Sequence, residues 1–235
     1  MATGRPAPSI WMRPERAAVG RPAGHSRAEI TAAALAIADG EGLDAVSMRR
    51  VAADLGTGAA SLYRYVETRE ELLDLMTDAV GGDYQLPPPS GDWLADLVAF
   101  GEQSRAILRR HPWLPALIMA RPVLGPNGLA LLEHVLTVLA PHPADIRTKM
   151  EAFATLNGIT AAFVQHELAG GSALQQRNTD YLQQALASGE HPRLAGLLSA
   201  GPPPAGPEPA EPADRYAGIL ARILTGLLGP DDRRS

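Results

Sequence analysis

The stretch "SMRRVAADLGTGAASLYRYVETREELLDLM", residues 47–76, decides the fold. Its apolar residues recur at the three- and four-residue spacing of helices, and two glycines interrupt that pattern. Ser47 can cap one helix that ends at Gly56, and a second, short helix follows from Gly58 to about Val66. Two helices joined by such a tight turn form a helix-turn-helix arrangement.

One helix on each side completes a small domain. A Ser or Thr followed three residues later by Glu forms a capping box, which marks helix starts at Ser26 and at Thr68. The glycines of "GEGL" can end the first of these helices, and the second runs to Val80. Residues 26–82 are therefore predicted to form a helical domain, with the helix-turn-helix as its central part.

The segment "GGDYQLPPPSGD", residues 81–92, breaks the helical pattern and marks a domain boundary. Beyond it the sequence predicts helices at 93–108, 129–139, 143–169 and 172–188, and a last one that continues to Leu228. A short helix is also predicted between the prolines of "HPWLPALIMARP", residues 111–122. The proline-rich stretch 199–213 cannot continue a helix, so we expect a flexible loop there. The expected fold is all-α, with a three-helix helix-turn-helix domain before a C-terminal helical domain at 83–235.

Residues 1–25 are rich in Pro, Gly and Ala, and their charged residues are mostly arginines. This composition predicts a flexible basic arm. Two interpretations stay open: a disordered tail without a role, or a basic arm with a role of its own.

Composition excludes several classes of function. The 235 residues include no cysteine, which rules out disulfides and thiolate metal sites, and none of the six histidines has a metal-binding spacing. No run of about 18 apolar residues could span a membrane, and the first residues lack the apolar core of a signal peptide. We expect a cytoplasmic protein without a cofactor or metal. The net charge of -5 argues against non-specific coating of nucleic acid, but it is compatible with a local basic patch.

The short helix after Gly58 carries the chemistry of DNA recognition. Small residues at its start, "AAS", allow the backbone to enter a major groove deeply. Arg64 is a long donor of the type that most often reads guanine O6 and N7. Tyrosine hydroxyls and the N–H groups at a helix start are typical phosphate contacts, and Thr68 and Arg69 at the next helix start suit that role.

This region, from about Ser26 to Val80, resembles the N-terminal DNA-binding domain of the TetR family of bacterial transcriptional regulators. The resemblance rests on the glycine stop of the first helix and on "VAADLG", "LYRYV" and "REELL". The family usually has lysine at Arg69 and an apolar residue at Thr57. The resemblance implies a ligand-responsive regulator that binds a palindromic operator as a homodimer and is released by a small molecule. Members of the family are usually repressors.

The resemblance also implies roles for individual residues in DNA binding. Arg49 and Arg50 would approach the backbone or a groove edge from the helix before the turn. The basic arm would reach the neighbouring minor groove through Arg21 or Arg27. The residues implied to face bases are Thr57, Ala59, Ser61 and Arg64, and those implied to hold phosphates are Tyr63, Tyr65 and Arg69.

The C-terminal domain is expected to dimerise and to bind the effector. Helices 143–169 and 213–228 are the candidate dimer interface, because small residues such as Gly158 permit close helix approach. An effector pocket should be apolar with a few polar anchors. The candidate lining residues are Trp93, Phe100, His111, Trp113, Met119, His134, Phe153, Asn157 and Phe163.

The alternative interpretation is a helical adaptor or scaffold whose helix-turn-helix has lost DNA binding. An enzyme is not expected, because "GHSRA" lacks the closing glycine of a nucleophile elbow and no phosphate-binding glycine loop is present. The sequence leaves open the operator, the effector, the regulated genes, repression against activation, and any DNA contact of the arm.

Overall fold

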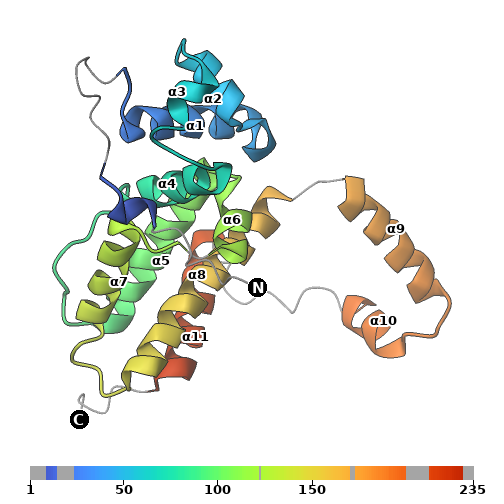
Figure 1. The fold of residues 1–235 in the computed structure, drawn as a ribbon. Coiled ribbons are helices and arrows are strands. Elements are labelled where there is room, and N and C mark those ends of the chain that lie inside the picture. Colours follow the sequence, from blue (N-terminus) through green and yellow to red (C-terminus); the bar gives the residue numbers. More distant parts are fainter. Residues whose placement is uncertain (1–8, 15–23, 122, 170–172, 200–211, 230–235) are drawn as a thin grey trace, which may run out of the picture.

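The computed structural model describes residues 9–14, 24–121, 123–169, 173–199 and 212–229. All regular elements in these ranges are helices, which confirms the expected all-α fold. A small helical unit lies at the top of Figure 1, a larger bundle lies below it, and α4 lies between them. None of the helices in the described ranges is long and apolar enough to cross a membrane.

The N-terminal unit, which we call the headpiece, consists of α1 (Arg27–Glu41), α2 (Met48–Asp54), α3 (Ala59–Leu62) and the start of α4 (Arg69–Gly81). Both hydrogen bonds of the capping box at Ser26 are present, and the Thr68 hydroxyl accepts from the Glu71 amide at the start of α4. The regular part of α3 ends four residues before the predicted Val66. The chain continues there as a turn in which the Val66 amide donates to the Leu62 carbonyl at 3.0 Å.

Gly56 is the residue that allows the tight turn between α2 and α3. Its φ is +65°, a left-handed conformation that favours glycine. The amides of Gly56 and Thr57 donate to the carbonyls of Ala53 and Ala52, so two end groups of α2 are satisfied.

The larger bundle is built from five helices. They are α5 (Trp93–Arg110), α6 (Leu114–Ala120), α7 (Pro126–Val138), α8 (Ile146–Leu168) and α11 (Pro212–Leu228). Tyr216 of α11 is fully buried between α5 and α8. Its hydroxyl donates to the Gly101 carbonyl at 3.1 Å and lies 2.6 Å from the Thr160 hydroxyl, so one side chain joins three helices.

Helices α9 (Ala173–Ala187) and α10 (Pro192–Ser199) extend to one side of the bundle in Figure 1. The prediction of a helix at 172–188 agrees with α9, whereas α10 was not predicted. Its proline at the first helical position is compatible with a helix start. Most of the proline-rich stretch 199–213 lies outside the described residues.

The hydrophobic core does not stop at the domain boundary predicted near residue 82. Leu114 and Leu117 of α6 share one buried cluster with Ile30 and Val51 of the headpiece. A second cluster, around Phe100 and Tyr216, fills the far end of the bundle. The headpiece therefore rests on α6 through continuous apolar packing.

Residues 9–14 differ from the flexible arm predicted for residues 1–25. They include a short 3-10 helix, Ile10–Met12, in which the Ile10 side chain is only 3% exposed and belongs to the headpiece core. Arg13 forms ion pairs with Glu67 and Glu71. Composition predicted disorder because it does not record the acidic partners of Arg13, which lie more than 50 residues further along the chain. Residues 1–8 and 15–23 lie outside the described residues.

Candidate nucleic-acid interface

The outer face of α3 is exposed and carries few large side chains. Ala60, Tyr63 and Arg64 are exposed at the spacing that places residues on one helical face, whereas Leu62 points inward and is fully buried. Thr57, Ala59 and Ser61 are half-buried at the start of the helix. Because Ala60 is exposed, it is a further candidate contact residue. The run of small residues at 59–61 is the sequence pattern that could have indicated it.

The two arginines of α2 have different surroundings. Both are exposed, but Arg50 forms two hydrogen-bonded contacts with the Glu41 carboxylate, at 2.8 and 3.0 Å. That pair partly neutralises its charge, so Arg49 is the more available cation on this helix.

Tyr63 and Tyr65 were predicted to hold phosphates together, yet the structure separates them. Tyr63 is 49% exposed, whereas Tyr65 is 6% exposed and packs in the headpiece core. The core position of Tyr65 leaves little surface for a phosphate, so its role here is packing.

Arg69 and Thr68 stabilise the headpiece through local hydrogen bonds. The Arg69 guanidinium donates to the carbonyls of Val46 and Leu43 at 3.0 and 3.1 Å, which ties α4 to the segment between α1 and α2. Thr68 is exposed and caps α4 through its hydroxyl. Arg27, one of the two arginines considered for a minor groove, also donates to backbone carbonyls, among them that of Tyr65.

The nine residues predicted to line an effector pocket do not gather in one cavity. Phe100 and His134 come together, with ring centroids 6.1 Å apart, and line a small cavity of about 80 Å³ between α5, α7 and the segment that precedes α5. Tyr84 stacks on the other side of Phe100 at 5.1 Å. Trp93 contacts His142 edge-on in the same core cluster.

The other predicted pocket residues lie elsewhere. His111 and Trp113 both contact Asp39 of α1, at the junction with the headpiece. Met119 is exposed beside Gly158, and Phe153 and Asn157 are half-buried on α8. The Phe163 ring packs edge-on against Tyr216.

The ion pair that joins α5 to α8 was not predicted from the sequence. Arg105 on the apolar face of α5 is buried and pairs with Glu167 of α8, with Nε 3.1 Å from Oε1. Its guanidinium also lies 5.4 Å from the centre of the Phe163 ring. An arginine within the buried stripe of α5, next to Ser104, was the available sign of such a pair, since a buried charge needs a partner.

Comparison with known proteins places this geometry in a family. The model of the tetR family of bacterial regulatory proteins matches residues 30–76, and the model of the tetracyclin repressor-like C-terminal domain matches residues 86–229. The second match alone covers more than half of the chain. The chain belongs to the TetR family. This TetR-family protein is thus a transcription regulator that binds DNA through the helix-turn-helix of α2 and α3.

Relatives and solved structures agree with this assignment. The HTH-type transcriptional repressor DrrR1 of Streptomyces coeruleorubidus is 38% identical over 210 residues, which cover 84% of this chain and 75% of that protein. An HTH-type transcriptional regulator of Saccharopolyspora erythraea is 41% identical over 133 residues, 56% of each chain. Apo ActR from Streptomyces coelicolor matches with a TM-score of 0.74 and 28% identity, over 90% of this chain and 99% of that chain. These relatives are regulators and not enzymes.

Proposed function

We propose that this TetR-family regulator represses transcription by binding a palindromic operator as a homodimer, and that an aromatic small molecule releases it. The observation that carries the proposal is the exposed face formed by α3 and the turn directly after it, where Tyr63 and Arg64 lie beside small residues. The repressor DrrR1 is a relative, and ActR has been crystallised with actinorhodin and with (S)-DNPA. Operator binding would place the protein in the cytoplasm, where bacterial DNA lies.

The exposed residues divide into two proposed roles. Arg64 reads a base edge, because its long side chain extends from the open face and can donate two hydrogen bonds to a guanine. Tyr63 and Arg49 hold phosphates and set the register of α3 in the groove. Thr57 and Ser61 contribute shorter contacts at the start of the helix.

A dimer is proposed through the outer faces of α8 and α11. α11 buries Tyr216, Leu220 and Leu224 against its own bundle, yet its Leu227 is exposed. Met150 on α8 is also exposed. A two-fold dimer would present two α3 helices to successive major grooves, about 34–36 Å apart.

The effector site is proposed around Phe100 and His134. The cavity there is smaller than the roughly 300–1,000 Å³ of drug-sized ligand sites, so a bound effector must favour a state in which α5 and α7 lie further apart. Motion of α7 reaches α4 directly, because the Asp78 carboxylate of α4 accepts from the amides of Asn127 and Gly128 at 3.3 and 2.9 Å. α4 in turn carries the headpiece.

Selection of bound duplexes from random DNA tests operator recognition. We expect the wild-type protein to enrich a palindrome, with an affinity that falls as salt concentration rises. Arg64→Ala should weaken binding to that palindrome by about 5- to 150-fold, the loss of roughly 1–3 kcal/mol. Arg193→Ala, on the exposed surface of α10, is the matched control and should bind normally. Failure of the wild-type protein to enrich any sequence would favour the adaptor interpretation.

Addition of actinorhodin to the operator complex tests the class of effector. Release of the DNA, lost in a Phe100→Ala protein that still binds operator, would support an aromatic effector at the α5–α7 cavity. Retention of the DNA at all soluble concentrations would overturn that class and leave operator recognition intact.

A further inference from the structure

Residues 9–13, which we call the strap, fold against the junction between the headpiece and the bundle. They precede both stretches that match the family models, 30–76 and 86–229. In Figure 1 the strap is the dark blue segment beside α4 and the top of α7. Its contacts come from three different parts of the chain.

The first set of contacts joins the strap to the loop before α4 and to α4 itself. The Arg13 guanidinium pairs with Glu67 in that loop and with Glu71 in the first turn of α4. The side chains of Arg13 and Glu71 are both only 18% exposed. The hydrogen bond to the Glu71 carboxylate raises the pKa of Arg13 above its usual value, so this guanidinium stays charged at any physiological pH. The other carboxylate oxygen of Glu71 accepts from the Glu67 amide at 2.8 Å.

The second set of contacts joins the strap to α1. Nη1 of Arg27 donates to the carbonyls of Ile10 and Arg13, at 3.2 and 2.8 Å. Nε of the same guanidinium donates to the carbonyl of Tyr65, just beyond α3, at 3.1 Å. The Arg27 side chain therefore contacts both the strap and the turn that follows α3.

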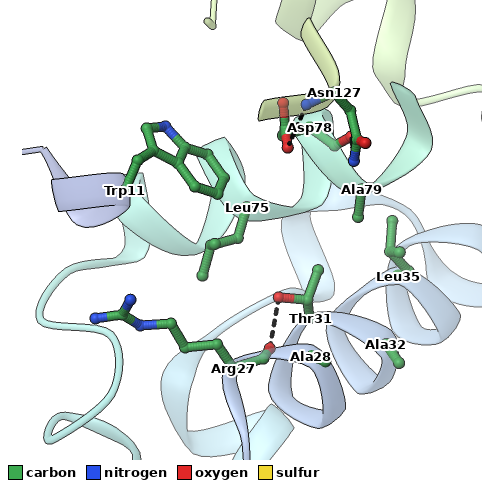
Figure 2. Close-up of a pocket in the computed structure, with 10 residues that line it drawn as sticks. All are labelled: Trp11, Arg27, Ala28, Thr31, Ala32, Leu35, Leu75, Asp78, Ala79 and Asn127. Carbon is green, nitrogen blue, oxygen red and sulfur yellow. Dashed lines mark hydrogen bonds between the residues drawn. The ribbon is translucent and has the colours of Figure 1, made fainter. Parts of the chain in front are cut away.

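The third set of contacts joins the strap to α7 in the bundle. A Cβ built on Gly125, directly before α7, would lie 2.7 Å from Cζ2 of Trp11, so the indole approaches this glycine too closely for any side chain there. The same Cβ would overlap the Asp78 carboxyl group, which holds the first amides of α7. Figure 2 shows Trp11 beside Leu75 of α4, with Asp78 and Asn127 next to each other above.

A cavity of about 270 Å³ lies between the strap, α1, α4 and α7. Trp11, Arg27, Thr31, Leu75 and Asn127 are among the residues that line it (Figure 2). Protein interiors are otherwise close-packed. Side-chain packing between α1 and α4 is therefore incomplete at this point, where Trp11 of the strap and Arg27 of α1 line the gap.

We propose that the strap is a brace that couples α7 to the headpiece, as a second connection parallel to α4, with Trp11 and Arg13 as its positioning residues. Trp11 contacts the bundle end of this connection and Arg13 contacts the headpiece end. Loss of the contact at one end must then increase local opening at the other end, because coupling between two sites is reciprocal.

Amide hydrogen exchange of the full-length protein tests this brace without an operator or an effector, so its outcome is independent of the proposed function. Arg13→Ala removes contacts only to the headpiece side, and we expect it to raise exchange of the Asn127 and Gly128 amides by about fivefold or more. Trp11→Ala removes the contact with the bundle, and it should raise exchange of the Glu67 amide to a similar degree. Met12→Ala, in the same strap but 78% exposed, is the matched control and should leave both sets unchanged.

Two results would overturn the proposal. In one, Arg13→Ala raises exchange only in the headpiece while the amides at the start of α7 keep wild-type rates. In the other, Met12→Ala has the same effect as Trp11→Ala, which would indicate general loosening of residues 9–13. Arg13→Lys keeps the charge and should restore near-wild-type exchange at α7, which separates the ion pairs from a general loss of stability.

Discussion

Asp39, near the end of α1, accepts a hydrogen bond from the indole N–H of Trp113 at 2.7 Å. Nδ1 of His111 lies 2.8 Å from the same carboxylate oxygen. Asp39 belongs to the headpiece, whereas Trp113 and His111 belong to the turn between α5 and α6. Trp113 is buried, so its N–H has little access to water if this acceptor is lost. The contact thus holds the headpiece on the bundle at a point separate from both α4 and the strap.

Asp39→Ala is expected to lower the free energy of unfolding by about 1–3 kcal/mol, because it leaves the buried indole N–H without an acceptor. Urea unfolding measures this loss, with Asp54→Ala on the exposed surface of α2 as the control. A double-mutant cycle with Trp113→Phe should show a coupling energy well above zero. Strictly additive effects would mean that the two side chains stabilise the protein independently.

Arg69→Ala is expected to destabilise the headpiece in the absence of DNA. It removes the hydrogen bonds to the carbonyls of Val46 and Leu43. The Leu43 carbonyl still accepts from the Val46 amide, so the expected loss of about 1–3 kcal/mol comes mainly from the Val46 carbonyl. Arg64→Ala, on the exposed face of α3, should change stability by no more than about 0.5 kcal/mol. If Arg69→Ala instead kept full stability and only weakened operator binding, the phosphate role predicted from sequence would be the correct one.

Gly101→Ala is expected to disrupt the contact between α5 and α11. The added Cβ would overlap Cδ2 of Leu220 and lie 2.9 Å from the Tyr216 hydroxyl. Such overpacking costs about 1–3 kcal/mol, which thermal unfolding would show as a lower Tm. Gly40→Ala on α1 is the same substitution with nothing within 4 Å of the new Cβ, so it should be neutral or slightly stabilising. Equal effects of the two changes would contradict the close approach of α11 to α5.

Alkaline pH is expected to destabilise the bundle through Tyr216. Burial is the main cause that raises the pKa of this phenol from its usual 10 to about 12. The folded state then keeps a proton that the unfolded chain releases, so this stabilisation is complete below pH 10 and is lost as pH rises to about 12.

Tyr216→Phe should remove this pH dependence, as measured by unfolding free energies across the alkaline range. Burial also raises the pKa of Tyr84, so both proteins should carry Tyr84→Phe in the comparison. An unchanged slope in the Tyr216→Phe protein would assign the alkaline loss to another group.

The headpiece was largely predictable because its start and stop positions depend on short-range chemistry. The capping box at Ser26 and the hydroxyl cap of Thr68 occupy the predicted helix starts, although Glu71 accepts from the Glu67 amide and does not complete a box at Thr68. Gly56 adopts the left-handed conformation that a turn after α2 requires. The exposed position of Arg64 also follows from the helical face it shares with Ala60. Each of these features depends on residues no more than a few positions apart.

The roles of single polar side chains were less predictable. Tyr63 and Tyr65 are two positions apart and have the same chemistry, yet one is on the surface and the other is in the core. Arg13 has the composition of a disordered arm around it, and its partner Glu71 is 58 residues away. The predicted pocket residues His111 and Trp113 were assigned to an effector, whereas they bind Asp39 of α1.

Local rules of capping, turn geometry and helical periodicity were therefore sufficient for the helix-turn-helix and for the all-α architecture. Only the tertiary structure decided which arginines are free, where the strap lies, and how α7 and the α5–α6 turn are held against the headpiece. The physical reason is range: helix caps and helical faces depend on neighbours within about four residues. Burial and ion pairing depend on which distant elements pack together, and nothing in the local pattern records that.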